Sequence, residues 1–305
     1  MDKNELLRLY NLDLDELLDI SSKYMKDEVE FCSLINARNG KCSQNCKYCA
    51  QSSHYCTNIE SYPLVDIKEV KKAALEAKEH KASRFAIVTS GKTPDEGRDF
   101  QLELDMIKEI NKIDGLNSCA SIGILDEEQA KQLAENGLKR FHHNINTAKS
   151  YYPEVCTTHT FDDRIKTCKL VKKYGMELCC GVILGMGESV EQRVEMALEL
   201  AEIQPDSIPI NILMPIPETP FENYLDKIDE ENVLRTLAIF KIANPQAVLR
   251  FCGGRMRLSE ENQKKALRSC VEGILIGNYL TTTGKKPEED IKIVAELGKK
   301  IKKIF

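Results

Sequence analysis

The sequence lacks tryptophan, long apolar runs and a strong charge of either sign. No apolar stretch approaches the roughly 20 residues that a membrane-spanning helix needs. The formal net charge of −5 gives no bulk attraction to nucleic acid or to an acidic membrane surface. The N-terminal stretch MDKNELLRLYNLDLDELLDI is acidic and amphipathic, and it has neither the basic start nor the apolar run of a signal peptide. We therefore expect a cytoplasmic protein that binds neither nucleic acid nor membrane.

Cysteine, by contrast, is abundant, with 12 residues in a chain of 305. Disulfides are rare in the reducing compartment that the missing signal peptide indicates. Metal ligation and plain burial are the remaining explanations for so many thiols. Hydrophobic residues make up 42% of the chain and charged residues 30%, which is typical of a folded protein with a sizeable core.

Short apolar, β-branched runs alternate with longer segments of helical periodicity. The runs predict eight strands at residues 29–37, 83–90, 116–124, 140–146, 176–184, 206–214, 247–254 and 272–278. Eight strands with intervening helices over about 250 residues predict a (βα)8 TIM-type barrel, an α/β fold. We assign the barrel to residues 29–305 and a short N-terminal helical cap to residues 1–28. An open doubly wound sheet is the second choice, because it does not need eight evenly spaced units.

The stretch KCSQNCKYCAQS follows the first predicted strand and contains Cys42, Cys46 and Cys49. In a barrel this is the first loop of the face where active sites lie. A structural zinc site normally has four protein ligands in two separated pairs, and no CxxC or HxxxH pair follows here. Cys56 is a possible fourth ligand, seven residues on. Three thiolates on a 4Fe-4S cluster instead leave one iron open to a small molecule, and we favour this interpretation over zinc.

CSQNCKYC resembles the cluster motif of the radical S-adenosylmethionine superfamily. The stretches AQSSHY, HHNINT, GVILGMGE, SIPIN and RFCGGR resemble the biotin synthase family, and the similarity runs from about residue 30 to residue 295. The resemblance implies a 4Fe-4S cluster on the three loop cysteines, with S-adenosylmethionine bound at its open iron. Reductive cleavage then yields a 5′-deoxyadenosyl radical, which removes hydrogens from dethiobiotin. The sulfur comes from an auxiliary iron–sulfur cluster, which is 2Fe-2S in the usual family member.

The resemblance also assigns residues to the S-adenosylmethionine site. Tyr48 packs against the adenine, and Ile183 contacts it from GVILGMGE, whose glycines permit close backbone approach to a flat ligand. Arg164 pairs with the carboxylate, which a guanidinium can bind through two hydrogen bonds. Asn146 holds the ribose, although the family usually has aspartate at this position. An asparagine there can still accept one hydrogen bond and donate another.

Further expectations concern the substrate and partners. The resemblance assigns Asn144 and Asn211 to the ureido ring of dethiobiotin, and an amide suits a group that both donates and accepts. His142 or His143 is a second candidate for substrate contact, although satisfaction by the backbone is an equal alternative. The family implies a low-potential flavodoxin or ferredoxin as electron donor and a homodimer as the assembly.

The auxiliary cluster is where the sequence departs from the family pattern. The usual ligands are three cysteines and one arginine on strands 2, 3, 5 and 7, and Cys119, Cys179 and Arg250 match three of them. The strand-2 position is Ala86, which cannot bind iron. Cys32 on strand 1 stands where the family commonly has serine beside the arginine. Strands 1, 3, 5 and 7 alternate around a barrel, so their side chains can share one interior layer.

We therefore expect an auxiliary cluster on Cys32, Cys119 and Cys179, with Cys252 or Arg250 as a possible fourth ligand. Cys252 is two residues past Arg250 and so faces inward on the same side of its strand. Three thiolates around the barrel axis suit a four-iron cluster with an extra sulfide better than the usual 2Fe-2S cluster. Four other cysteines are expected only to pack in the core, namely Cys156, Cys168, Cys180 and Cys270.

Two other classes stay open at this point. A hydrogenase maturase or a methylornithine-forming mutase would share the loop and the barrel. An iron–sulfur electron carrier would bind every iron through protein and would not need an eight-stranded barrel.

Overall fold

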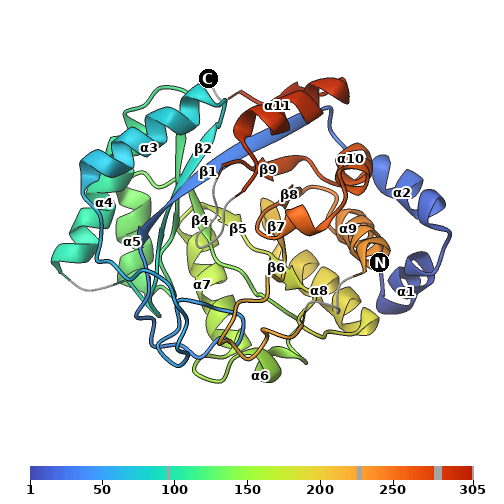
Figure 1. The fold of residues 1–305 in the computed structure, drawn as a ribbon, viewed down its shortest axis with the longest axis horizontal. Helices are drawn as coiled ribbons and strands as arrows, with labels where there is room; N and C mark the ends of the chain where they lie inside the picture. Colours follow the sequence, from blue (N-terminus) through green and yellow to red (C-terminus); the bar gives the residue numbers. More distant parts are fainter. Residues whose placement is uncertain (95–96, 225–228, 278–283, 304–305) are drawn as a thin grey trace.

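Parallel strands form the centre of the molecule, and helices lie outside them (Figure 1). The computed structural model describes residues 1–94, 97–224, 229–277 and 284–303. The central strands are β1 (Glu28–Arg38), β2 (Arg84–Thr89), β3 (Asn117–Ser121), β4 (Arg140–His142), β5 (Glu177–Cys179), β6 (Val182–Leu184), β7 (Ser207–Ile212), β8 (Val248–Phe251) and β9 (Gly273–Leu275). Parallel pairing of β9 with β1 closes the sheet. The predicted barrel is therefore confirmed, and the open sheet is excluded. The last residue of the predicted strand 272–278 lies outside the described residues.

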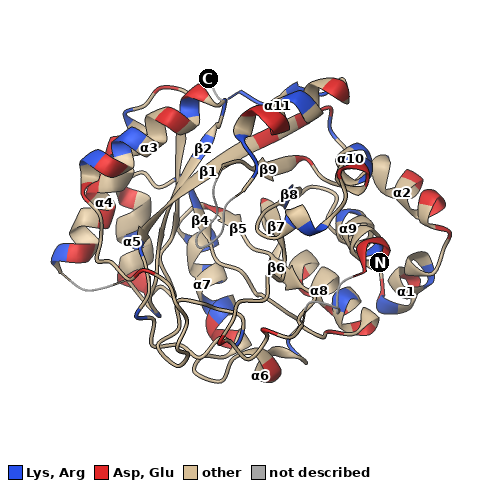
Figure 2. Cartoon of the chain, viewed as in Figure 1, with Lys and Arg blue, Asp and Glu red and all other residues tan. Residues whose placement is uncertain are grey.

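The helices of the barrel carry most of the charged side chains, whereas the strands carry few (Figure 2). They are α3 (Ile67–Glu79), α4 (Arg98–Asn111), α5 (Glu127–Glu135), α6 (Tyr152–Val155), α7 (Phe161–Lys173), α8 (Val190–Ile203), α9 (Glu230–Ala243), α10 (Glu260–Ser269) and α11 (Pro287–Glu296), with a 3-10 turn η2 (Arg255–Arg257). Side-chain caps begin several of them, and Asp126, Thr160 and Ser189 each form a capping box. None of the helices in the described ranges is long and apolar enough to cross a bilayer.

Two helices precede the barrel, α1 (Lys3–Tyr10) and α2 (Leu14–Ser22). They pack against α8, α9 and α10 on the right of Figure 1. Arg235 Nη1 on α9 donates to the carbonyl of Tyr10 at 2.9 Å, and Tyr10 Oη donates to Asn232 Oδ1 at 3.1 Å. Near the other end of the chain, β10 (Lys300–Ile301) pairs with the start of β1.

Alternate residues of the strands face opposite sides of the barrel wall. Phe31, Phe141 and Phe251 belong to the large apolar core that includes helix residues, so they face outward. Their neighbours Cys32 and Cys252 belong to a separate cluster. The inner side of these strands is therefore rich in thiol and charged groups, and the apolar core lies between strands and helices.

The predicted strand 176–184 is divided into β5 and β6, and both pair with β7. The break falls at Cys180 and Gly181. A Cβ atom at Gly181 would lie 1.9 Å from the carbonyl oxygen of Pro209 on β7. We expected the glycines of GVILGMGE to let the backbone approach a flat ligand. At Gly181 the backbone instead approaches the neighbouring strand β7.

Gly181→Ala is expected to destabilise the fold by about 3 kcal/mol, because the added methyl group collides with backbone that cannot rotate away. Urea unfolding of both proteins measures the difference. Gly253→Ala is the matched control, since its Cβ meets only the side-chain oxygen of Asn211, at 3.2 Å. Equal midpoints for Gly181→Ala and the parent chain would contradict the expectation.

Candidate active site

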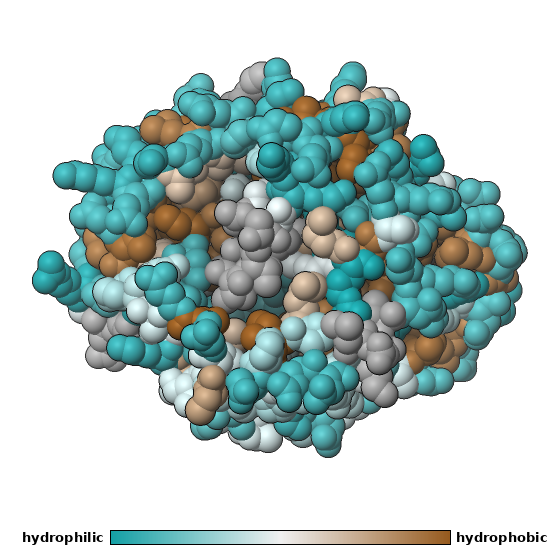
Figure 3. Space-filling model, in the orientation of Figure 1, coloured by the Kyte–Doolittle hydropathy of each residue, from teal (hydrophilic) through white to brown (hydrophobic). Residues whose placement is uncertain are grey.

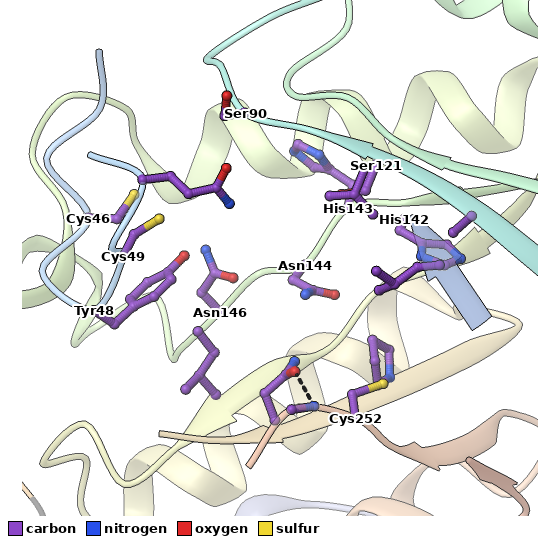
Figure 4. Close-up of a pocket in the computed structure, with 18 of the residues that line it drawn as sticks. Cys46, Tyr48, Cys49, Ser90, Ser121, His142, His143, Asn144, Asn146 and Cys252 are labelled. Carbon is purple, nitrogen blue, oxygen red and sulfur yellow. Dashed lines mark hydrogen bonds between the residues drawn. The ribbon is translucent and has the colours of Figure 1, made fainter. Parts of the chain in front are cut away.

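A cavity of about 410 Å³ lies at the C-terminal ends of the strands, where a barrel places its chemistry. Figure 3 shows a mainly hydrophilic face with apolar areas between its polar side chains. In Figure 4, Cys46, Tyr48 and Cys49 lie at one end of the pocket, and Cys252 and His142 lie on the opposite side. Asn144 and Asn146 lie between them. The cavity therefore has two cysteine-bearing ends with amide side chains in the middle.

The loop after β1 holds its three cysteines through backbone hydrogen bonds. Cys42 N donates to Gln51 O at 2.9 Å, and Cys49 N donates to Cys46 O at 3.0 Å. Cys42, Cys46 and Cys49 all border the cavity, so the structure brings together the residues predicted from the motif. Cys56, the alternative fourth ligand, is exposed and is not among the described residues that line the cavity.

The spacing of these thiols fits a cluster better than a single ion. Sulfurs bound to one zinc ion lie no more than about 4.6 Å apart. Among the described residues, the three loop sulfurs do not all lie within 4.8 Å of one another. All three residues border the same cavity. Burial raises the pKa of Cys49 to about 11, so this thiol must release its proton when it binds iron.

Tyr48 and Ile183 form an apolar wall beside this loop. Ile183 belongs to a buried cluster with Val155 and Met186, and Tyr48 packs against that cluster. Ile183 N donates to Asn146 O at 2.8 Å, which ties β6 to the segment after β4. Asn146 has a φ of 68°, a left-handed conformation that asparagine tolerates better than most residues. An aromatic ring, an aliphatic side chain and an amide thus meet at one corner of the cavity.

Arg164 reaches the cavity from α7. Its Nε donates to Tyr152 Oη at 3.0 Å, and its Nη2 lies 3.3 Å from His159 Nε2. Among the described residues Arg164 has no carboxylate within ion-pair distance, whereas Arg193 beside Glu188 does. A guanidinium without a carboxylate partner at a cavity wall is suited to an anionic ligand.

The two asparagines predicted to contact the substrate both line the cavity, and the backbone fixes their carbonyl oxygens. Asn144 Oδ1 accepts from Gly181 N at 3.0 Å, and Asn211 Oδ1 accepts from Gly253 N at 3.0 Å. Asn211 Nδ2 also donates to Val182 O at 3.3 Å. Within the described part of the chain, Asn144 Nδ2 has no protein partner, and it remains available as a donor.

The opposite end of the cavity is lined by Cys32, Cys179, Cys252 and Arg250. Arg250 Nη1 lies 2.9 Å from Cys32 Sγ, so the arginine and the strand-1 cysteine are directly joined. Cys119 is completely buried against Ala86 and Val88 and is not among the described lining residues. Its thiol still lies close enough to Cys32 and Cys179 for their charges to raise its pKa.

Burial first, and then these neighbouring thiols, raise the pKa of Cys119 to about 12, while Arg84 and Arg140 oppose the rise. Burial likewise raises the pKa of Cys179, although Arg250 and Arg140 act against it. Guanidinium groups near these sulfurs therefore favour the thiolate form that iron requires.

A network of buried charges, which we did not anticipate from the sequence, lies next to these thiols. Glu30, with 1% of its side chain exposed, is surrounded by three arginines. Arg140 Nη1 donates to Glu30 Oε1 at 2.8 Å, Arg250 Nη2 donates to the same oxygen, and Arg84 Nε lies 3.1 Å from Glu30 Oε2. Burial acts to raise the pKa of Glu30, but the arginines hold it well below its ordinary value. The network fixes Arg250 beside Cys32.

Both histidines of the HHN run border the cavity and are neutral. Burial, together with Arg140 and Arg250, lowers the pKa of His142 to about 3. Burial also lowers the pKa of His143 well below its ordinary value, and His143 Nε2 has no hydrogen-bond partner among the described atoms.

Cys156 is buried in the core, as expected, and it also has polar contacts that the sequence did not predict. Its sulfur lies 3.7 Å from Cys46 Sγ, and both sulfurs contact His159 Nε2. In the sequence we found no CxxC or HxxxH pair after the first loop and therefore expected no second pair of metal ligands. The pair that exists is mixed, a CxxH spacing at residues 156–159.

Family models match two consecutive parts of the chain. The model described as the radical SAM superfamily covers residues 38–201, and the Biotin and Thiamin Synthesis associated domain covers residues 209–300. The first match is more than half of the chain and includes the three loop cysteines. The second contains Asn211, Arg250 and Cys252.

Curated relatives match nearly the whole chain. Biotin synthase from Acetivibrio thermocellus is 46% identical over 282 residues, which are 92% of this chain and 87% of that protein. Biotin synthase from Clostridium tetani is 43% identical over 293 residues, 95% of this chain and 89% of that protein.

Solved structures share the fold at low sequence identity. Methylornithine synthase superposes with a TM-score of 0.83 at 16% identity, over 99% of this chain and 94% of that one. A maturase of the FeFe-hydrogenase superposes with a TM-score of 0.83 at 16% identity, over 98% of this chain and 71% of that one. These two likenesses concern the barrel alone. The curated relatives, the two family models and the cysteine loop at the cavity together show that the chain belongs to the biotin synthase family of the radical SAM superfamily.

Proposed function

We propose that the chain forms biotin by inserting sulfur into dethiobiotin, with a 4Fe-4S cluster on Cys42, Cys46 and Cys49 and S-adenosylmethionine beside it. The observation that carries the proposal is the cavity with cysteines at both ends and amides between them. Such an arrangement suits a substrate held between a centre that starts the reaction and a centre that delivers sulfur. An electron carrier has no use for this space between two thiol sets.

When bound, the 4Fe-4S cluster and S-adenosylmethionine supply a 5′-deoxyadenosyl radical for hydrogen abstraction, and the auxiliary cluster supplies sulfur. The chain's own contribution begins with enclosure, because a carbon radical attacks any accessible bystander. Residues from β1 to β9 line the cavity, and Cys32, Cys179 and Arg250 at the end away from the cysteine loop are buried. The loop cysteines contribute three thiolates by releasing their protons.

The S-adenosylmethionine site is proposed to use Tyr48, Asn146, Arg164 and Ile183. Tyr48 and Ile183 provide the apolar wall that suits adenine, and Arg164 provides an unneutralised positive charge for the carboxylate. The contact of Arg164 Nε with Tyr152 Oη orients the guanidinium. Asn146, whose backbone is fixed by bonds to Gly181 and Ile183, presents its amide to the ribose.

Arg164→Gln is expected to weaken S-adenosylmethionine binding by about 10- to 100-fold, since a hydrogen bond to a charged group contributes about 1.5–3 kcal/mol. Equilibrium binding to anaerobically reconstituted protein measures the change. Lys166→Gln removes an exposed positive charge from the same helix and serves as the control. If both variants bind like the parent chain, Arg164 does not hold the carboxylate.

Dethiobiotin is proposed to lie between the two ends of the cavity, against Asn144 and Asn211. The backbone N–H of Gly181 donates to Asn144 Oδ1, so the amide nitrogen Nδ2 of the same side chain can donate to the ureido carbonyl. Asn211 is held at both amide atoms and provides a fixed polar surface. The neutral imidazoles of His142 and His143 add polar groups without adding charge.

For the auxiliary cluster we propose the ligands Cys32, Cys119 and Cys179, with Cys252 or Arg250 as the fourth. Cys32, Cys179, Cys252 and Arg250 share one end of the cavity, which supports this set. Among the described residues, the sulfurs of Cys32, Cys119 and Cys179 do not all lie within 4.8 Å of one another, which favours a polynuclear cluster over a single ion. We propose a four-iron cluster with an extra sulfide in place of the 2Fe-2S cluster of the usual enzyme.

Cys32→Ala is expected to remove the auxiliary iron while leaving the 4Fe-4S cluster and the cleavage of S-adenosylmethionine intact. Iron and sulfide counts and a Mössbauer spectrum of reconstituted protein measure the loss. Cys270→Ala, at a fully buried thiol outside the cavity lining, controls for the packing defect. Full auxiliary iron in Cys32→Ala would rule out this ligand set.

The remaining parts of the proposal follow the family. They are a flavodoxin or ferredoxin as electron donor, a homodimer and a cytoplasmic location. Light scattering of the reconstituted protein and reduction by each purified donor test the first two, and cell fractionation tests the third.

The test of the proposed function is product formation under exclusion of air. Reconstituted chain, a low-potential reductant, S-adenosylmethionine and dethiobiotin are expected to give 5′-deoxyadenosine, methionine and biotin. Cleavage of S-adenosylmethionine without biotin would point to another reaction of the same superfamily. No cleavage by fully loaded, reduced protein would remove the radical mechanism.

A further inference from the structure

Behind the cluster loop, Cys46, Cys156 and His159 form a compact set of ligand-type atoms. Cys46 Sγ lies 3.7 Å from Cys156 Sγ and 3.5 Å from His159 Nε2, and Cys156 Sγ lies 3.4 Å from His159 Nε2. All three side chains are buried. The three ligand atoms all lie within 4.8 Å of one another. No other group of at least three His, Cys, Asp or Glu residues in the described part of the chain meets this criterion.

These three distances match a tetrahedral metal site. With zinc–sulfur bonds of about 2.3 Å and zinc–nitrogen bonds of about 2.05 Å, tetrahedral angles place two sulfurs about 3.8 Å apart. The same geometry places a sulfur and a nitrogen about 3.5 Å apart. A single ion therefore fits among Cys46, Cys156 and His159, provided that His159 Nε2 exchanges its contact with Arg164 Nη2 for the ion.

The imidazole of His159 is already oriented for such a role. Arg164 Nη2, which can only donate, lies 3.3 Å from His159 Nε2, so that nitrogen carries a lone pair. The proton then resides on Nδ1, which lies 2.9 Å from Tyr152 Oη. A metal-binding histidine commonly donates its other N–H to an oxygen in this way.

Hydrogen bonds from the side chain of Asn45 and from the backbone of Lys47 hold the two segments together without any metal. Asn45 Oδ1 accepts from Thr157 N at 3.0 Å and from Thr158 N at 3.2 Å. Lys47 N donates to Val155 O at 3.0 Å. The cysteine loop and the CxxH pair of residues 156–159 are thus two separated ligand segments that the fold brings into contact, which is the usual pattern of a zinc site.

We propose that, when the 4Fe-4S cluster is absent, Cys46, Cys156 and His159 bind one divalent transition-metal ion such as Zn²⁺, with water in the fourth position. Binding displaces the thiol protons that these two cysteines carry, and they leave as H⁺. Because the ion and the cluster both need Cys46, they exclude each other. The ion protects the Cys46 thiol in the cluster-free chain and must leave before the cluster is built. The site does not depend on which substrate the enzyme converts.

The test uses the full chain, freed of iron and sulfide and kept reduced in an anaerobic chamber, and titrates it with Co²⁺ and with Zn²⁺. We expect one Co²⁺ per chain with the visible absorption of tetrahedral thiolate-bound cobalt, and displacement of that absorption by Zn²⁺. Cys156→Ser and His159→Gln should each weaken binding by at least about tenfold, whereas Cys42→Ser should bind like the parent chain.

The competing outcome is that the CxxxCxxC loop binds the ion by itself. Parent-like binding by Cys156→Ser and His159→Gln overturns the proposal. X-ray absorption at the zinc edge of the unmodified chain needs no variant and therefore guards against misfolding. Two sulfurs and one nitrogen per zinc support the site, and three sulfurs without nitrogen refute it.

Discussion

Cys49→Ser is expected to abolish the cleavage of S-adenosylmethionine, with a loss of at least about 10³-fold, because it removes a proposed cluster ligand on which the reaction depends. Cys49 borders the cavity beside Tyr48, on a loop whose turn is fixed by the bond from Cys49 N to Cys46 O. A serine hydroxyl cannot ionise to give the third anionic ligand, and two thiolates do not retain a four-iron cluster that depends on three. The fold itself should tolerate the change, because sulfur is exchanged for a smaller oxygen.

The measurement is 5′-deoxyadenosine formed per chain by anaerobically reconstituted protein, together with its iron content. Cys56→Ser is the matched control, since it makes the same exchange at an exposed cysteine of the same loop. It should retain full iron and full cleavage. Normal cleavage by Cys49→Ser would mean that this cysteine is no cluster ligand.

Glu30→Gln should lower the free energy of unfolding by about 3–5 kcal/mol, the usual cost of removing one partner from a buried ion pair. Three guanidiniums converge on this carboxylate, whose side chain is 1% exposed. Glutamine has the same shape but no charge, so Arg250 loses the carboxylate that offsets its desolvation. Arg84 and Arg140 lose one of two such partners and keep their ion pairs with Glu177. Repulsion among the arginines then adds to the cost.

Urea unfolding of the cluster-free chain measures this effect. Glu28→Gln, at the exposed first residue of β1, is the control and should change stability by less than about 0.5 kcal/mol. A shift of similar size in both variants would contradict a special role for the buried network. A large shift in Glu30→Gln alone would identify it as a major stabilising element of the barrel interior.

The barrel could be predicted from the sequence, because each strand is marked by its own short run of apolar residues. The runs 29–37 and 83–90 became β1 and β2 almost without change, since β-branched and aromatic residues in short apolar runs favour strands wherever they pack. The run 176–184 was predicted as one strand and forms two. The cause is the collision that any side chain at Gly181 would have with Pro209. That contact is 28 positions away in sequence, so no local pattern reveals it.

The residues of the candidate site also fall into those that the sequence reveals and those that only the fold brings together. Cys42, Cys46 and Cys49 could be found because one short loop carries all three. The Glu30 network could not, because its charges come from separate strands and look like ordinary charged residues in the sequence. His159 and Cys156 had a visible signal, the CxxH spacing, but its meaning depends on Asn45 holding that segment against the first loop.

The contact between Cys46 and His159, and that between His159 and Arg164, have a thermodynamic consequence. The proposed ligand of the cluster and the proposed anchor of the S-adenosylmethionine carboxylate share one imidazole. A shift of the His159 ring caused by iron binding at Cys46 also moves the ring relative to Arg164. We therefore expect cluster binding and the affinity for S-adenosylmethionine to be coupled. Coupling of this kind is reciprocal. The factor by which the cluster raises the affinity for S-adenosylmethionine is also the factor by which S-adenosylmethionine raises the affinity for the cluster.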